Sequence, residues 1–183
     1  MNDPNGLVWH KGRFHLFYQY HPSAPVWGPM HWGHAVSRDL VHWSDRPIAL
    51  APDPLGAIFS GSAVVDQANT SGLGRARNPA LIALFTYHNE AEKRAGRPPE
   101  SQGLAYSQDG GDTWVKYAEN PVLRPDHGQR DFRDPKLFWH SPTKRWVATL
   151  AVGDHVEFYG SANLKTWQLL SRFSPKEIGR AHV

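Results

Sequence analysis

Two aspartates, Asp3 and Asp134, are each followed by a proline and begin the same longer pattern. In both places a Trp-His pair follows, at Trp9-His10 and at Trp139-His140. A carboxylate can attack an electrophilic carbon or accept hydrogen bonds from sugar hydroxyls, and several carboxylates around one cavity are what glycoside hydrolysis requires. A single Asp-Pro pair is more often only the opening of a turn. The repetition of the pair at matching places makes a shared site as good an interpretation as two separate turns.

Short β-strands are the elements that must position the two aspartates. Apolar or alternating runs are separated by turn residues, and the chain contains 16 Gly and 15 Pro. This spacing is typical of strands joined by turns, and no long amphipathic helix is indicated, so we predict an all-β protein. Because proline restricts the residue before it, we expect the backbone of Asp3 and Asp134 to be extended. The clearest predicted strands are 6–10, 14–19, 62–66 and 81–85.

A second pattern consists of a strand that ends at serine, a polar turn and a tryptophan. In each copy an Asp or Asn near the turn can accept hydrogen bonds from its own backbone, and the tryptophan packs on the outgoing strand. Each copy therefore predicts a β-hairpin. The three copies span 34–43, 104–114 and 158–167.

Together the two repeats predict a β-propeller with long loops, because units of four short strands are typical of propeller blades. We place the blades at about 1–50, 57–124 and 130–173. Propellers have about four to eight blades, so three blades would not close a ring, and we expect a partial propeller. The innermost strand of each blade lines the central channel, so Asp3 and Asp134 should face one cavity.

The end of the chain, 174–183, has no strand character. Its last six residues, Ile178–Val183, correspond to the translation of a sequencing-adapter string. We expect 174–183 to be a non-native or disordered tail. The natural gene would contradict this if it contained the same six codons followed by a stop.

Composition narrows the class of protein. The net charge of +3 arises from 20 basic and 17 acidic side chains that are scattered along the chain. The one dense cluster, 92–100, mixes both signs and contains Gly and Pro, which indicates a solvated loop and not a nucleic-acid patch. The absence of Cys excludes disulfides, a thiolate nucleophile and Cys-ligated zinc. No apolar run approaches the roughly 18 residues of a membrane helix, so we predict no membrane partner.

Three histidines close in sequence, His31, His34 and His42, raise the question of a metal site. His31 and His34 are three residues apart in a stretch that should be extended, so their side chains would point to opposite faces. A tetrahedral site needs its ligands on one side. We therefore predict no metal here.

Motifs in a fixed order make the chain resemble the invertase, levanase and inulinase family of glycoside hydrolases. Members are β-fructofuranosidases with a five-bladed propeller, and the resemblance covers about 1–173. It implies retaining hydrolysis of terminal β-D-fructofuranosyl units of fructans or sucrose, with no cofactor. The matching motifs are Met-Asn-Asp-Pro-Asn-Gly (1–6), Phe-Tyr-Gln-Tyr-His-Pro (17–22), Trp-Gly-Pro-Met-His-Trp-Gly-His (27–34), Phe-Ser-Gly-Ser (59–62) and Phe-Arg-Asp-Pro (132–135).

The resemblance also implies roles for single residues. Asp3 would be the nucleophile and Asp134 the transition-state stabiliser that binds sugar hydroxyls. Arg133 would be the charged neighbour of Asp134, and we expect it to favour ionised Asp3 as well. Simpler roles remain for these residues. The two aspartates and the Phe59-Ser60 pair could belong to turns, Gln19 could be a polar residue at a strand edge, and Trp27 could be a core residue. The fructosyl pocket would be lined by Asn2, Gln19, Trp27, Phe59 and Ser60.

The chain departs from the family pattern in one respect. The family's general acid/base is a Glu followed by Cys, in a strand after the third blade, and this chain has no Cys. Glu177 lacks the flanking pattern. A general acid contributes about 10²- to 10⁴-fold, so we expect this fragment to be close to inactive. Met1 coincides with a Met inside the first motif, so we also expect upstream sequence, including any signal peptide, to be missing; secretion is favoured if fructan is the substrate.

Three alternatives stay open at this point. A fructosyltransferase would use the same intermediate but pass it to a sugar instead of water. A non-catalytic propeller would bind fructan without turnover. A related hydrolase acting on arabinan or xylan is disfavoured by the motifs at Trp27 and Phe59. The segments 59–66 and 69–72 look more like exo-acting levanases and inulinases than like intracellular sucrose-phosphate hydrolases.

Overall fold

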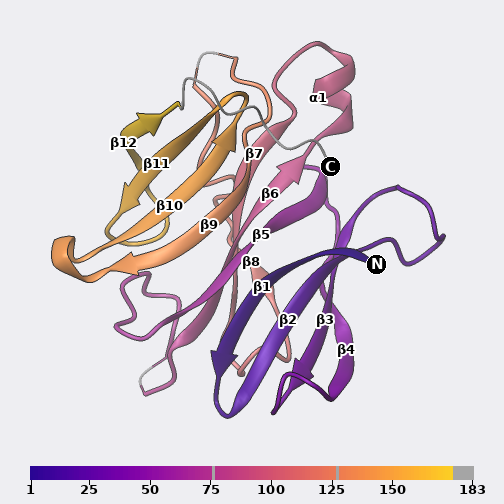
Figure 1. The fold of residues 1–183 in the computed structure, drawn as a ribbon, viewed down its shortest axis with the longest axis vertical. Coiled ribbons are helices and arrows are strands. Elements are labelled where there is room, and N and C mark those ends of the chain that lie inside the picture. The colour runs from indigo at the N-terminus through magenta and orange to yellow at the C-terminus, as the bar shows by residue number, and fades with distance from the viewer. Residues whose placement is uncertain (76, 127, 175–183) are drawn as a thin grey trace.

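The computed structural model describes residues 1–75, 77–126 and 128–174. Nearly all of the tail predicted to be non-native or disordered, 175–183, lies outside these residues. The described chain folds into three four-stranded antiparallel sheets that follow one another along the sequence. Figure 1 shows the sheets fanned out side by side, and the inner strand β5 packs against both β1 and β9.

Each sheet is a simple meander of neighbouring strands. The first contains β1 (Asn2–His10), β2 (Arg13–Tyr20), β3 (His31–Ser37) and β4 (Trp43–Leu50). The second contains β5 (Ala57–Asp66), β6 (Ala80–His88), β7 (Glu100–Ser107) and β8 (Val115–Lys116). The third contains β9 (Arg133–His140), β10 (Arg145–Val152), β11 (His155–Ser161) and β12 (Gln168–Phe173).

In the part of the chain that the structure describes, helical structure is confined to the loops. The α-helix α1 (Glu90–Arg94) lies between β6 and β7, and the 3₁₀ helix η1 (Ser141–Thr143) lies between β9 and β10. Among the helices of the described ranges, none has the length and apolar character needed to cross a bilayer. The all-β prediction is confirmed.

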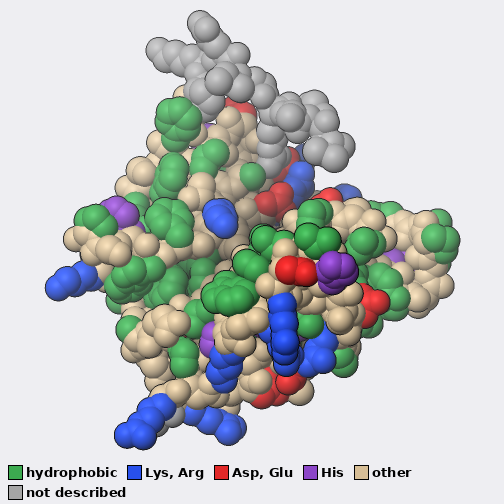
Figure 2. Space-filling view, turned by 60° about the horizontal axis from the view of Figure 1, so that its bottom comes forward, with side chains coloured by type: hydrophobic (Ala, Val, Ile, Leu, Met, Phe, Trp, Pro, Cys, Tyr) green, Lys and Arg blue, Asp and Glu red, His purple; other side chains and the backbone are tan. Residues whose placement is uncertain are grey.

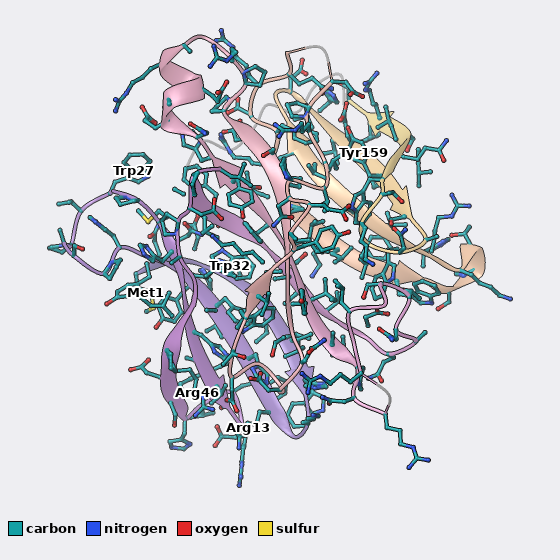
Figure 3. The ribbon with its side chains drawn as sticks, turned by 180° about the vertical axis from the view of Figure 1, so that it is seen from behind. Met1, Arg13, Trp27, Trp32, Arg46 and Tyr159 are labelled. Carbon is teal, nitrogen blue, oxygen red and sulfur yellow. The ribbon has the colours of Figure 1, made fainter. Side chains whose placement is uncertain are left out.

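The hydrophobic core lies between the sheets. Trp32 of β3 and Phe85 of β6 belong to a buried cluster between the first and second sheets. Leu84 of β6 and Leu150 of β10 belong to a second cluster, between the second and third sheets. Figure 3 shows Trp32 and Tyr159 on opposite sides of this middle sheet. Strand β6 is buried at every position because both of its faces are covered, which explains its nearly continuous apolar sequence.

The three predicted hairpins are confirmed, and in each of them the serine hydroxyl donates to the Asp or Asn side chain of the turn. At the first turn, the Ser37 hydroxyl donates to the Asp39 carboxylate (3.1 Å), and the backbone N–H groups of Val41 and His42 donate to the same carboxylate oxygen. The turn is therefore closed locally by side chains. In every copy the tryptophan indole donates to a turn carbonyl: Trp43 to Leu40, Trp114 to Gly111 and Trp167 to Leu164.

Each inner strand is irregular at its cavity end. The pairing register shifts between Asn2 and Pro4 in β1, and comparable shifts occur in β5 and β9. The backbone φ is +39° at Asp3 and +59° at Asp134, so the prediction of extended aspartates was wrong. A bulge turns the chain at this point, and aspartate tolerates positive φ better than most residues. Such a conformation costs about 1–3 kcal/mol and marks functional sites.

The mixed-charge cluster 92–100 is only partly a solvated loop. Its first residues belong to α1, which Asn89 caps by accepting hydrogen bonds from the N–H groups of Ala91 and Glu92. Its last residue, Glu100, begins β7 and is only 4% exposed. The prediction of a solvated loop was therefore wrong for Glu100, because that carboxylate is buried beside Arg133 and His88.

The hairpin ends of the sheets mix charges of both signs. Figure 2 shows Lys and Arg side chains at several places on this face, with acidic side chains between them. Arg46 pairs with Asp112 across the first and second sheets, and His42 pairs with Asp39 at 2.8 Å. The charges of basic side chains on this face are thus partly neutralised by neighbouring aspartates.

Two histidines form a buried pair inside the first sheet. His15 Nδ1 lies 3.1 Å from His34 Nε2, and both residues are almost fully buried. Burial, followed by nearby positive charge, lowers the pKa of His15 to about 4 and that of His34 to about 3. In the unfolded chain both would titrate near 6.5. The unfolded state therefore binds more protons below pH 6.5.

We expect this pair to make the fold acid-sensitive. The free energy of unfolding should fall as the pH drops from about 6.5 towards 4, by up to about 1.4 kcal/mol per pH unit for each histidine. Urea unfolding at a series of pH values would measure the slope. A His15→Leu, His34→Leu double variant should flatten it, whereas the exposed-histidine control His42→Gln should keep it. An unchanged slope in the double variant would contradict the assignment.

Candidate active site

The eight residues predicted to form a site all line one open cavity of about 1450 Å³. They come from the cavity ends of β1, β2, β5 and β9 and from the loop between β2 and β3. The inner strands supply most of them, because each bulge turns side chains towards the space between the sheets. The residues are Asn2, Asp3, Gln19, Trp27, Phe59, Ser60, Arg133 and Asp134.

Asp3 presents an exposed carboxylate at the start of β1. Ser60 Oγ of β5 lies 3.4 Å from one carboxylate oxygen, and Asn2 Nδ2 lies 3.5 Å from the other. The Asn5 side chain donates to the Asp3 carbonyl at 3.1 Å and so supports the positive-φ backbone. The carboxylate is thus oriented by neutral donors from two sheets and remains accessible to a ligand in the cavity.

Asp134 lies on the third sheet, next to a cluster of charges. Arg133 Nε is 3.7 Å from the Asp134 carboxylate, and Arg133 Nη1 is 2.6 Å from Asp131 and 3.3 Å from Glu100. Within the residues that the structure describes, the ion pairs of Arg133 are thus with carboxylates other than Asp3. Arg133 thus lies beside Asp134, but its charge is shared among Asp134, Asp131 and Glu100.

Glu100 is the buried carboxylate of this charge cluster. Its carboxylate lies 3.5 Å from His88 Nδ1 and 3.3 Å from Arg133 Nη1. Burial alone would raise the pKa of Glu100, but His88 and Arg133 together hold it below its usual value. An ionised Glu100 holds the Arg133 guanidinium at Nη1, while Nε of the same group faces Asp134.

Aromatic and amide side chains form the remaining wall. The Phe59 ring is stacked on the His88 imidazole, with ring centroids 4.4 Å apart. Trp27 is 66% exposed on the loop between β2 and β3, as Figure 3 shows, and is not a core residue. Gln19 is only 4% exposed, and its Nε2 has no hydrogen-bond partner within the described ranges. A buried amide without a partner is costly unless a ligand or water accepts its protons.

The histidines considered for a metal site have separate surroundings. His31 Nδ1 lies 2.8 Å from the Pro29 carbonyl, His34 pairs with His15, and His42 pairs with Asp39. The geometry therefore does not bring these three rings to one point.

Sequence reasoning missed several cavity residues, among them Met30, His88, Glu100 and Asp131. Asp131 could have been found from its spacing, because it stands two residues before Arg133, as would suit side chains on one face of an extended chain. His88 and Glu100 gave no local signal. They meet at the cavity only because β6 and β7 pair from His88 to Glu100.

Comparison with known proteins identifies the family. The model of the glycosyl hydrolases family 32 N-terminal domain matches residues 1–182. The chain belongs to glycosyl hydrolase family 32. It is 54% identical over 173 residues to a levanase of Bacillus subtilis, covering 94% of this chain and 24% of that protein. It is 42% identical over 194 residues to an extracellular exo-inulinase of Aspergillus niger, covering 96% of this chain and 36% of that protein.

Solved structures of family 32 enzymes have the same fold. A crystal structure of exo-inulinase from Aspergillus awamori has a TM-score of 0.85 at 40% identity, covering 96% of this chain and 38% of that one. A β-fructofuranosidase from Schwanniomyces occidentalis complexed with fructosyl-erythritol has a TM-score of 0.84 at 42% identity, covering 95% and 34%. The chain thus spans about a quarter to somewhat over a third of the length of these relatives, and the partial-propeller prediction is confirmed.

Proposed function

We propose that this chain is the nucleophile-bearing part of a retaining β-fructofuranosidase that releases terminal β-D-fructofuranosyl units from fructans or sucrose. One observation carries the proposal. Asp3 and Asp134 lie on the inner strands of two different sheets, each has a positive φ at a bulge of its own strand, and both line one cavity. The names of the family 32 relatives, levanase and exo-inulinase, support a fructan substrate. A polymeric substrate in turn favours secretion of the whole protein.

In the proposed reaction Asp3 attacks the anomeric carbon of the fructosyl unit as the bond to the leaving oxygen breaks. The leaving oxygen takes a proton from a general acid. Water then attacks the same carbon and gives one proton to the conjugate base of that acid, which releases fructose and restores the Asp3 carboxylate. Asp134 accepts hydrogen bonds from fructosyl hydroxyls, and these bonds strengthen as positive charge develops on the sugar. Phe59 and Trp27 offer apolar surface to the ring.

We propose that the general acid is a glutamate outside this chain, supplied by the rest of the protein. A general acid contributes about 10²- to 10⁴-fold to such a reaction. The 183-residue chain by itself should therefore bind the sugar but turn it over very slowly. Addition of the native continuation should restore activity.

Product analysis of the whole protein tests the proposal. With sucrose, inulin and levan as substrates, proton NMR at early times should show β-fructofuranose released with retention. Fructosylated oligosaccharides from sucrose alone would indicate transfer to sugar instead. Binding of fructan without any product would leave a non-catalytic propeller and contradict the proposal.

Gln19 provides a more local test, because its buried Nε2 lacks a partner among the residues that the structure describes. In the Gln19→Leu variant of the whole protein, we expect the Kd for fructose to rise about tenfold, the effect of one lost hydrogen bond. The melting temperature should stay unchanged or rise, since an unpaired buried donor is removed. Calorimetric titration and thermal unfolding measure both quantities. A fall in stability with unchanged affinity would show that Gln19 is structural.

A further inference from the structure

The backbone around Asp134 is held by side chains of the neighbouring sheet. Strand β9 pairs regularly with β10 up to Lys136, shifts register at Asp134 and Pro135, and resumes pairing at Arg133. Backbone groups at such a bulge lose their ladder partners and must be satisfied in another way. Here buried polar side chains of the second sheet take over this task.

Thr86 and Gln102 form a closed hydrogen-bond circuit with residues 132 and 134. The Asp134 backbone N–H donates to Thr86 Oγ1 (3.1 Å), and the Thr86 hydroxyl donates to Gln102 Oε1 (2.9 Å). Gln102 Nε2 in turn donates to the Phe132 carbonyl (2.8 Å). Thr86 and Gln102 are opposite each other on β6 and β7, and both are fully buried.

A second contact fixes the chain just beyond Asp134. The Ser62 hydroxyl of β5 donates to the Pro135 carbonyl (2.9 Å) and accepts a hydrogen bond from the Leu137 N–H (2.8 Å). Ser62 is only 5% exposed. The aspartate is thereby held on both sides by rigid, buried strands of the second sheet.

The preceding pair of sheets uses the same device. The Trp32 indole of the first sheet donates to the Phe59 carbonyl of β5 at 3.0 Å, again at a bulge that carries site residues. In both cases a buried side chain of one sheet holds the irregular inner strand of the next. The contact is therefore suited to setting the position of the side chains at the bulge.

We propose that Thr86, itself held by Gln102, is a positioning residue that sets the place of the Asp134 carboxylate through the Asp134 backbone N–H. The inference rests on the proposed function, in which Asp134 binds fructosyl hydroxyls in the transition state. Asp134 has a positive φ of 59°, a conformation that persists only where the surroundings impose it. Groups that stabilise a transition state must be held within about 0.5 Å of the productive geometry.

The test uses Thr86→Val in the whole protein, because valine keeps the shape and removes the hydroxyl. We expect kcat/KM on sucrose to fall about tenfold to a hundredfold, the range for a lost hydrogen bond that leaves buried groups unpaired. Thr86→Ser, which keeps the hydroxyl, should stay within about threefold of the wild type. If the Thr86→Val variant does not fold, kcat/KM of Thr86→Ala can be compared with that of Thr86→Ser, because alanine also lacks the hydroxyl and is smaller than valine.

Thr70→Val is the matched control. The Thr70 hydroxyl donates to Asp66 (3.0 Å) and accepts from the Trp146 indole (2.8 Å), so the variant also loses two hydrogen bonds, here partly buried, in a loop that does not line the cavity. It should lower the melting temperature but leave kcat/KM unchanged. Equal kcat/KM in the two valine variants, after correction for folded fraction, would overturn the proposal.

A double-mutant cycle with Asp134→Asn separates positioning from general damage. If Thr86 acts through the Asp134 carboxylate, Thr86→Val should cost little further activity once that carboxylate is gone. A full additional loss in the double variant would overturn the proposal. Failure of the wild-type protein to cleave sucrose, inulin or levan would contradict the proposed function instead, and so is distinguishable from a wrong assignment of Thr86.

Discussion

Replacement of Asp3 by Asn should remove nearly all turnover from the whole protein, with kcat falling on the order of 10⁴-fold or more. An amide of the same shape cannot form the bond to the anomeric carbon, so both halves of the reaction stop. The fold should survive, because the carboxylate is exposed and its contacts with Ser60 and Asn2 are long. We expect the free energy of unfolding to change by less than about 0.5 kcal/mol.

Steady-state kinetics and thermal unfolding of Asp3→Asn measure these two effects. Asp45→Asn is a suitable control, because Asp45 is an exposed aspartate of β4 that does not line the cavity. In the wild type, acid quenching during turnover followed by peptide mass spectrometry should place one fructosyl unit on the peptide that contains Asp3. A variant that retains more than about a tenth of the wild-type kcat would rule out Asp3 as the nucleophile.

Replacement of Asp134 by Asn should have the second-largest effect. We expect kcat/KM to fall on the order of 10²- to 10³-fold, the range seen when one preorganised group that stabilises a transition state is removed. The Kd for fructose should rise by a much smaller factor, because the hydrogen bonds to the sugar hydroxyls strengthen mainly in the transition state. Arg133 keeps its ion pairs with Asp131 and Glu100, so the fold should persist.

Kinetics on sucrose and calorimetric titration with fructose separate the two effects of Asp134→Asn. If the Kd for fructose rose by the same factor as kcat/KM fell, Asp134 would contribute uniform binding and not transition-state stabilisation. His140→Gln offers a control on the same strand, since His140 is at the far end of β9 and contacts Thr143 at 2.7 Å. It should leave both quantities unchanged.

The sequence predicts much of this fold because its signals are local. Alternating strands and the repeated serine, Asp or Asn and tryptophan of the hairpins report interactions over a few residues, and the structure contains them at Ser37 and Trp43 as expected. Eight of the residues that line the cavity were also predicted, because they belong to short contiguous motifs that match a family.

Other features depend on distant parts of the chain and could not be predicted. The Asp-Pro pair predicts an extended aspartate, but contacts from a neighbouring sheet hold Asp134 at positive φ. The charges around Glu100 predict a solvated loop, but strand pairing with β6 buries that carboxylate beside His88. In both cases tertiary packing overrides a local preference.

The location of the two aspartates on separate sheets has a consequence for how the protein becomes active. Neither sheet can form the site by itself, because β5 lies between the strands that carry Asp3 and Asp134. During refolding, circular dichroism would register each meander as it forms from contacts close in sequence. Catalytic competence would return only after the three meanders have docked. Recovered turnover is therefore a measure of assembly between modules, and the lag between the two signals would give its rate.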